Sequence, residues 1–193
     1  VMKADLCQIY TDVEGVFTAD PRKVIDARKL DHISYDEMLE LATLGAQVLN
    51  NRSVEMAKKY GIRLEVLSSL TKKRGTIVKE ATNVEKMLIS GIAKDEDVAR
   101  VSIIGVPDRP GLAFKIFSKL SAKNINVDII LQSVGRNGTK DISFTVSQAN
   151  LKETIDILDP YVELIGATSG VYDENVAKVS IVGAGMETHP GTA

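Results

Sequence analysis

Residues 99–111 read Ala-Arg-Val-Ser-Ile-Ile-Gly-Val-Pro-Asp-Arg-Pro-Gly, and residues 177–191 read Ala-Lys-Val-Ser-Ile-Val-Gly-Ala-Gly-Met-Glu-Thr-His-Pro-Gly. Each stretch joins a run rich in β-branched residues to a Gly and then, through a turn, to Pro-Gly, and the two begin about 78 residues apart. Self-similarity of this kind indicates a duplicated domain. The second copy reaches Ala193 where its helix is expected to begin, so we expect this copy to be incomplete.

The first copy predicts a complete small α/β fold. Two prolines and a Gly within 107–111 forbid regular structure and mark a turn, and Asn137-Gly138 is a strong hairpin signal. The flanking hydrophobic patterns predict the order β-α-β-β-α-β in about 75 residues, which is the ferredoxin-like arrangement. The expected strands are 98–106, 125–134, 141–147 and 162–171, and the expected helices are 112–123 and 151–158.

The N-terminal part has a different order of predicted elements, strand-loop-helix-helix-strand, which indicates the edge of an α/β layer domain. Ser34-Tyr35-Asp36-Glu37 is a capping box followed by apolar residues at helical spacing, so a helix is expected over 35–49. Ser53 is expected to cap a second helix over 54–60, which Gly61 ends. Strands are expected at 6–10, where the apolar run indicates burial, and at 62–67.

A charged stretch with a Gly, residues 71–83, is expected to separate the two parts, with the domain boundary near residue 80. A further strand at 87–93 is expected to join one of the sheets, and the sequence does not indicate which. The chain is thus predicted to contain an α/β part at 1–80, a ferredoxin-like domain with its preceding strand at 81–172, and the start of a second such domain at 173–193.

Composition and charge exclude several classes of protein. The 193 residues are 44% hydrophobic and 26% charged with a net charge of -2, so no basic surplus points to a nucleic-acid partner. No apolar stretch approaches the ~20 residues of a membrane span, and the first residues do not resemble a signal peptide. We therefore expect a cytoplasmic protein. The lone Cys7 lies in an apolar run and is expected to be buried and reduced, because no His lies near it in sequence to make it a nucleophile.

The loop at 11–22 is the segment richest in candidate chemistry. It reads Thr-Asp-Val-Glu-Gly-Val-Phe-Thr-Ala-Asp-Pro-Arg and follows a strand, where open α/β sheets bind ligands. It offers hydroxyls, carboxylates, a Gly that permits close backbone approach and an Arg that can bind a phosphate with its forked guanidinium. From these residues alone, nucleotide binding and a solvated connecting loop with a turn at Asp20-Pro21 both stay open.

This loop, together with Tyr10, resembles the nucleotide-binding signature of the aspartokinases, which are members of the amino acid kinase family. The run 33–42, Ile-Ser-Tyr-Asp-Glu-Met-Leu-Glu-Leu-Ala, is similar to the same family, as is Arg52-Ser53-Val54-Glu55 downstream. The duplicated unit, with Asp-Arg-Pro-Gly in one copy and His-Pro-Gly in the other, resembles the paired ACT domains that follow the kinase domain in these proteins. The resemblance extends over essentially the whole chain.

The resemblance implies an ATP site in the N-terminal part. Thr11 and Asp12 would hold the nucleotide near its base and ribose, and Arg22 would approach its phosphates. Gln47 stands where relatives commonly have a Lys that contacts ATP, although it is equally readable as a plain residue on a helix surface; Asn50-Asn51-Arg52 likewise replaces a common His-Pro-Arg. The implied ATP-binding set is Thr11, Asp12, Phe17, Thr18, Ala19, Asp20, Pro21, Arg22 and Gln47.

The resemblance also implies an effector site in the first ACT unit, at an interface between two copies. Asp108 and Asp128 would meet an α-ammonium group, and the helix start near Leu112 suits a carboxylate because a helix N-terminus carries partial positive charge. Ordinary turn and strand-end polarity is the alternative reading. The implied set is Asp108, Gly111, Leu112, Asn126, Val127, Asp128 and Gln132. No metal-binding cluster is expected; His32 reads as a solvated residue, and Met186, Thr188 and His189 occupy the equivalent turn of the second copy.

The function that the resemblance implies is that of an aspartate kinase, which uses ATP with Mg²⁺ bridging its phosphates to phosphorylate the β-carboxylate of aspartate. Lysine or threonine would act as feedback effectors, and the ACT domains would assemble a homodimer or a higher oligomer. Nothing in the chain matches the aspartate-binding residues or the catalytic lysine of the family, so this segment alone is expected to be inactive. The alternatives are a non-catalytic regulatory subunit and, less economically, an unrelated ACT-bearing protein that matches the loop and the helix by accident.

Overall fold

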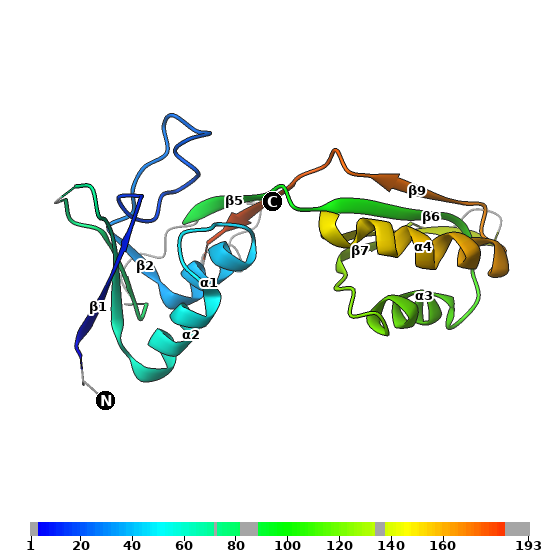
Figure 1. Ribbon diagram of the computed structural model, residues 1–193, viewed down its shortest axis with the longest axis horizontal. Coiled ribbons are helices and arrows are strands. Elements are labelled where there is room, and N and C mark those ends of the chain that lie inside the picture. Colours follow the sequence, from blue (N-terminus) through cyan, green and yellow to red (C-terminus); the bar gives the residue numbers. More distant parts are fainter. Residues whose placement is uncertain (1–3, 72, 82–88, 134–137, 184–193) are drawn as a thin grey trace. The chain divides into compact units, whose positions relative to one another are not determined.

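The computed structural model describes residues 4–71, 73–81, 89–133 and 138–183. The chain divides into two compact units (Figure 1). The first unit comprises Val1–Asp95 together with Val179–Ala193, and the second comprises Glu96–Lys178. The division falls after residue 95, whereas the sequence placed the domain boundary near residue 80.

A mixed four-stranded sheet forms the centre of the first unit, in the order β1-β3-β4-β2. β1 (Leu6–Thr11) runs parallel to β3 (Arg63–Ser68), β3 runs antiparallel to β4 (Thr76–Lys79), and β4 runs parallel to β2 (His32–Ser34). Two helices, α1 (Tyr35–Thr43) and α2 (Asn51–Tyr60), contribute to the same hydrophobic core. Its fully buried side chains include Met38, Leu41, Val54, Val66 and Val78.

The two helix starts and ends follow from local residue chemistry. The predicted capping box is confirmed, since the Glu37 amide donates to Ser34 Oγ at 3.2 Å and the Ser34 amide donates to Glu37 Oε2 at 3.0 Å. The helix ends at Thr43 rather than at 49, because the chain turns at Gly45, where φ is 116°. The second helix begins earlier than predicted, because Asn50 and not Ser53 is its N-cap; Gly61 ends it as predicted, with φ at 64°.

Burial of the first strand was predicted wrongly. β1 lies at the edge of the sheet with β3 as its neighbour, and most of its side chains are exposed. Tyr10 is 60% exposed, and Cys7 is exposed rather than part of the core. The sequence also missed β4, which lies inside the expected break at 71–83, and β2, which has three residues and is too short to show a pattern.

A second, two-stranded sheet belongs to the first unit, except for Lys178, the last residue of the second unit. This sheet shows where the additional strand pairs. β5 (Gly91–Asp95) pairs with β10 (Lys178–Val182), the strand that opens the second sequence copy. The strand that was grouped with the first ferredoxin-like domain therefore pairs with the second copy instead. The Ser90 amide extends this connection by donating to Val182 O at 2.7 Å. The turn with Met186, Thr188 and His189 lies outside the described residues.

The second unit confirms the predicted β-α-β-β-α-β order. It contains β6 (Ala99–Pro107), α3 (Leu112–Ser121), β7 (Asp128–Gln132), β8 (Thr139–Val146), α4 (Gln148–Leu164) and β9 (Ser169–Asp173). Its strands pair antiparallel in the order β7-β8-β6-β9, the ferredoxin-like sheet, and both helices lie against one face of it (Figure 1). In the core between these layers, the rings of Phe117 and Phe144 pack edge to face, with their centroids 5.3 Å apart.

Helix α4 ends later than predicted because tertiary burial overrides a local breaker. Asp159-Pro160 favours ending the helix at 158, yet α4 continues through Pro160 to Leu164. Tyr161 and Val162, which follow the proline, are buried in the core and hold the last turn against the sheet. The final strand consequently begins at Ser169 rather than at 162.

Candidate functional site

The loop that follows β1 is anchored by one buried threonine. Thr76, at the start of β4, is fully buried, and its Oγ1 donates to Leu30 O at 2.6 Å. The same oxygen accepts from the Val16 amide at 2.8 Å. A single hydroxyl therefore joins the outgoing and returning arms of the loop to the central sheet.

Above this anchor, the two arms of the loop form a short antiparallel ladder. Phe17 and Lys29 form an antiparallel bridge, and the Leu30 amide donates to Val16 O at 2.8 Å. Thr18 contributes twice, because its amide donates to Arg28 O at 2.9 Å and its Oγ1 accepts from the Arg28 amide at 3.0 Å. Residues 19–27 therefore form the tip of a supported hairpin. The tip itself is exposed over residues 21–26, and it turns at Asp20-Pro21, where the Lys23 and Val24 amides both donate to Asp20 O at 2.9 Å.

Gly15 is required where the loop passes the anchor. Its φ is 148°, and a Cβ built on it would lie 2.4 Å from Thr76 Oγ1. A side chain at this position would therefore displace the hydroxyl that holds the loop. The Gly permits close backbone approach, as the sequence suggested, but here it approaches a neighbouring side chain of the protein itself.

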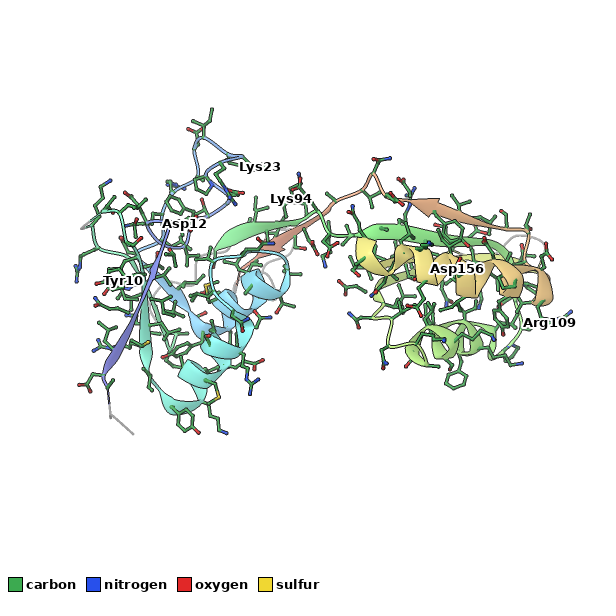
Figure 2. The ribbon with its side chains drawn as sticks, viewed as in Figure 1. Tyr10, Asp12, Lys23, Lys94, Arg109 and Asp156 are labelled. Atoms are coloured by element: carbon green, nitrogen blue, oxygen red, sulfur yellow. The ribbon has the colours of Figure 1, made fainter. Side chains whose placement is uncertain are left out.

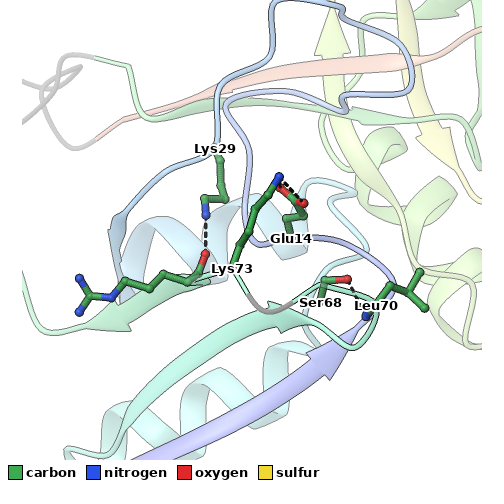
Figure 3. Close-up of polar contacts among 6 residues, drawn as sticks. Glu14, Lys29, Ser68, Leu70 and Lys73 are labelled. Atoms are coloured by element: carbon green, nitrogen blue, oxygen red, sulfur yellow. Dashed lines mark hydrogen bonds and ion pairs between the residues drawn. The ribbon is translucent and has the colours of Figure 1, made fainter.

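Two lysines connect the loop to the segment between β3 and β4 (Figure 3). Lys73 Nζ lies 3.0 Å from Glu14 Oε1, and Lys29 Nζ donates to the Arg74 carbonyl at 2.5 Å. In the same region Ser68 Oγ accepts from the Leu70 amide at 3.1 Å (Figure 3). Both lysine ammonium groups are thus engaged by the protein itself.

Arg22 and Asp20 form the main charged pair of the tip. Arg22 Nε and Nη2 donate to the two carboxylate oxygens of Asp20 at 3.0 and 3.1 Å, and the Arg22 amide donates to Oδ1 at 3.0 Å. The hydrogen bonds from Arg22 lower the pKa of Asp20, and the same contact raises the pKa of the Arg22 guanidinium. With 82% of its side chain exposed, Arg22 is oriented by Asp20 and still has donors that can reach a ligand.

The structure brings only some of the other implied ATP-binding residues together. A pocket of about 340 Å³ beside the ladder includes Thr18 and Ala19 from that set. Thr11 Oγ1 folds back onto the backbone of Val13, and Asp12 is exposed just beyond the end of β1 (Figure 2). The pocket is completed by residues outside the predicted set, namely Val24, Asp26, Ala27, Arg28, Ile89, Ser90, Gly91 and Ile92.

Gln47 does not lie on a helix. It occupies an exposed turn between α1 and α2, after the chain has left the helix at Gly45. The reading of Gln47 as a residue on a helix surface is therefore wrong, while its proposed contact with ATP stays a prediction.

Strand β5 contacts the loop, and Ser90, the residue before it, contacts helix α1. The Ile92 amide donates to Thr18 O at 2.8 Å, and the Ser90 hydroxyl donates to Glu37, whose other oxygen completes the capping box. Sequence reasoning found Glu37 as a capping residue but missed Ser90, Thr76 and Lys29. Each of these meets its partner across a large sequence separation, so no local pattern signals it.

In the second unit, the residues implied for effector binding fall into two groups. Asp108, Gly111 and Leu112 lie between β6 and the start of α3, where Gly111 is the N-cap with φ at 86° and no side-chain cap bond. Lys140 Nζ lies 3.1 Å from Asp108 Oδ1, and the Asp108 amide donates to Gly138 O at 2.8 Å. This group therefore sits at the end of the sheet where β8 begins.

The other group follows β7 from Asn126, Val127 and Asp128 to Gln132. Asp128 pairs in register with Thr145, near the end of β8, and Thr145 Oγ1 donates to its carbonyl at 3.0 Å. Its carboxylate lies 2.6 Å from Lys178 Nζ, and this hydrogen bond lowers the pKa of Asp128. Asn126 and Gln132 are exposed, and Val127 packs partly against the core.

The strand register separates the two aspartates within one copy. Asp108 is held beside Lys140 and Asp128 beside Thr145, positions five residues and roughly 17 Å apart along β8. One ammonium group cannot contact both carboxylates of the same copy. An ammonium site that uses both carboxylates therefore requires the second unit of another molecule of the protein.

Among the described residues, the helices are all too short or too polar to cross a membrane. The same residues contain no group of three or more His, Cys, Asp and Glu side chains that could hold a metal ion.

Comparison with known proteins gives a family match for each of the two parts of the chain. Residues 1–68 match the amino acid kinase family, and residues 100–161 match the ACT domain. The aspartokinase of Helicobacter pylori is 48% identical over 197 aligned positions, which include the whole of this chain and 48% of that protein. The chain thus spans about half the length of the curated relatives it matches.

Two solved structures support the same relationship. The aspartate kinase of Clostridium acetobutylicum, described as an allosteric enzyme, aligns with 98% of this chain and 44% of its own at 28% identity, with a TM-score of 0.82. The regulatory subunit of aspartate kinase from Thermus thermophilus is 36% identical, with 55% of this chain and 70% of that subunit aligned and a TM-score of 0.52. The chain belongs to the aspartokinase family.

Proposed function

We propose that this chain supplies the nucleotide-binding and effector-sensing parts of an aspartate kinase, which transfers the γ-phosphoryl group of ATP to the β-carboxylate of aspartate. This reaction would open the route to lysine, threonine and methionine. The observation that carries the proposal is the supported hairpin tip at 19–27, in the loop that follows β1. There the exposed guanidinium of Arg22 is oriented by the carboxylate of Asp20. The family match over 1–68 supports the same assignment.

The nucleotide would lie along the loop at 11–22. Thr11 and Asp12 would contact its base and ribose, and the donors of Arg22 that Asp20 does not use would bind the phosphates. These groups fit a nucleotide because they combine hydrogen-bonding residues near the strand end with a cation at the tip. Mg²⁺ would be held mainly by the phosphates themselves, since proteins commonly bind this ion through one or two carboxylates and substrate oxygens.

The remaining parts of the reaction are assigned to the whole protein. Aspartate and the group that promotes transfer have no matching residues in this chain, so we expect the segment alone not to phosphorylate aspartate. In domain terms, residues 1–80 would belong to the kinase domain. Residues 100–161 would lie in the first ACT domain, and β5 with β10 would open the second.

A non-catalytic regulatory subunit is the second candidate. The Thermus thermophilus regulatory subunit aligns with 55% of this chain, whereas the aspartokinase of Helicobacter pylori aligns with all of it. A pure sensor would have no need of the nucleotide loop and its buried support at Thr76. These observations favour the kinase.

Replacing Arg22 tests the nucleotide assignment. In the full-length protein, Arg22→Met should raise the Kd for ATP by about tenfold, because a charge-assisted bond to a phosphate is lost. The measurement is calorimetric titration with ATP and MgCl₂. Arg63→Met is the matched control, since it removes another exposed guanidinium of the same unit, at the start of β3. Equal affinities of the two variants would remove Arg22 from the site.

We further propose that the second unit assembles with another copy through β7. This strand is at the edge of its sheet, and its apolar side chains are open to solvent: Ile129 is 47%, Ile130 50% and Leu131 63% exposed. Antiparallel pairing of two β7 edges would bring the Asp128 end of one copy beside the Gln132 end of the other. Asp108 lies toward that second end, so pairing would complete the effector site that one copy leaves divided.

A charge placed on this edge should dissociate the assembly. Ile130→Lys in the full-length protein is expected to lower the molar mass measured by light scattering during size-exclusion chromatography, because two buried lysines would face each other across the interface. Leu164→Lys, at the exposed end of α4, is the control and should leave the mass unchanged. Unchanged assembly in Ile130→Lys would assign the interface to another surface.

A further inference from the structure

The ion pair between Lys178 and Asp128 is unusual in the burial of its cation. The Lys178 side chain is 10% exposed, whereas that of Asp128 is 56% exposed, and the two charged atoms lie 2.6 Å apart. The long apolar stem of the lysine is therefore covered by protein while its ammonium is held against a carboxylate that faces solvent. Such a lysine is already ordered, so it reaches its partner at a smaller entropic cost than a free surface lysine.

The contact between Lys178 and Asp128 is of the same kind as the contact proposed for the effector, an ammonium group against the Asp128 carboxylate. An amino-acid effector would place an ammonium on the carboxylate of Asp128, and Lys178 already provides an ammonium there. Two ammonium groups on one carboxylate repel each other at short range, and the single negative charge can neutralise only one of them. The effector and Lys178 are therefore competitors for the same group.

We propose that Lys178 is a tethered competitor of the amino-acid effector, which binds Asp128 by displacing the lysine ammonium. The inference rests on the proposed function, because it concerns the same effector site. It adds a residue that lowers affinity for the effector and so sets the concentration at which the effector acts.

The position of Lys178 in the chain links its displacement to the nucleotide loop. Lys178 is the first residue of β10, which pairs with β5. The Ile92 amide of β5 is hydrogen-bonded to Thr18 O in the nucleotide loop. A ligand that binds better when Lys178 has been released shifts the protein toward the released state. Effector binding would thus act on the first residue of a strand whose partner holds the nucleotide loop.

The test compares variants of Lys178 in the full-length protein by calorimetric titration with L-lysine and, separately, with L-threonine. Lys178→Met keeps an unbranched apolar stem and removes the charge, so it should bind the effector about three- to fivefold more tightly than the unaltered protein. Lys178→Arg retains the competing cation and should bind with nearly unaltered affinity. Arg100→Met is the matched control, because it breaks another exposed ion pair of the same unit, Arg100 with Asp173 at 3.2 Å.

Each outcome decides the inference. Tighter binding by Lys178→Met alone supports the competitor. Equal or weaker binding by Lys178→Met, with the unaltered protein still binding, overturns the competitor and leaves the effector site in place, because Lys178 would then be neutral or a ligand contact. No binding of either amino acid to any of these proteins overturns the effector site and the competitor together.

Discussion

Gly75→Ala should destabilise the first unit by about 3 kcal/mol or more, because an added methyl group has no space there. A Cβ on Gly75 would lie 2.0 Å from the carbonyl oxygen of Val66 and 2.8 Å from the Cβ of Leu67. The nearest atom belongs to the backbone of the central strand β3, so no side-chain rotation can relieve the contact. The register of β3 with β4, which begins one residue later at Thr76, would have to shift.

Native-state hydrogen exchange of the β3 and β4 amides measures this loss in the unit concerned. Gly61→Ala is the matched control, because a Cβ on Gly61 would meet no atom within 4 Å. The φ of 64° at Gly61 adds only the penalty of the left-handed conformation, about 1–2 kcal/mol. Exchange in Gly75→Ala that stays within about 1 kcal/mol of the unaltered protein would show that β3 and β4 do not approach as the structure has them.

Thr76→Val should both destabilise the nucleotide loop and weaken ATP binding. The substitution conserves the shape of the side chain but leaves the Val16 amide and the Leu30 carbonyl without the hydroxyl that joins them. Val16 and Thr76 are buried, so water does not readily replace the lost bonds, and the cost is about 2–4 kcal/mol. Loosening the base of the hairpin also lets its tip, with Arg22, leave the orientation that a nucleotide needs.

Thr76→Ser keeps the hydroxyl and is the control for the lost methyl group. We expect ATP affinity, measured by calorimetric titration of the full-length protein, to fall in Thr76→Val and to be largely retained in Thr76→Ser. Stability follows from urea unfolding of the same proteins. A Thr76→Val protein that binds ATP with unaltered affinity would separate the buried anchor from the nucleotide site.

The parts of the fold that local chemistry determines were predictable from sequence. The capping box at Ser34 and Glu37 and the left-handed stop at Gly61 need only neighbouring residues, and both are confirmed. The ferredoxin-like order of the second unit was also predictable, because its strands and helices differ in hydrophobic periodicity and because Pro or Gly marks the turn after β6 and the turn before β8.

The errors arose where position in the tertiary fold decides the outcome. An apolar strand sequence does not reveal that β1 lies at a sheet edge, so Cys7 was expected to be buried and is exposed. Pro160 is a local breaker, yet the burial of Tyr161 and Val162 carries α4 past it. The pairing of β5 with β10 joins segments more than 80 residues apart, which no local pattern can specify.

The candidate sites show the same division. Residue chemistry pointed to the loop at 11–22, and the family resemblance pointed to its role. The contacts that give the loop its shape come from Thr76, Lys29 and Lys73, whose partners are distant in sequence. In the second unit, the register of β8 shows that Asp108 and Asp128 stand apart in one copy, which could not be inferred before their strands were paired.

The most direct measurement of the central claim is ADP release by the full-length protein with ATP and MgCl₂, with and without aspartate and over a range of lysine or threonine concentrations. The proposed function predicts turnover that depends on aspartate and falls as one of these amino acids is added. Turnover that ignores aspartate would contradict the kinase assignment. Aspartate-dependent turnover that neither amino acid changes would contradict the assignment of the second unit as their sensor.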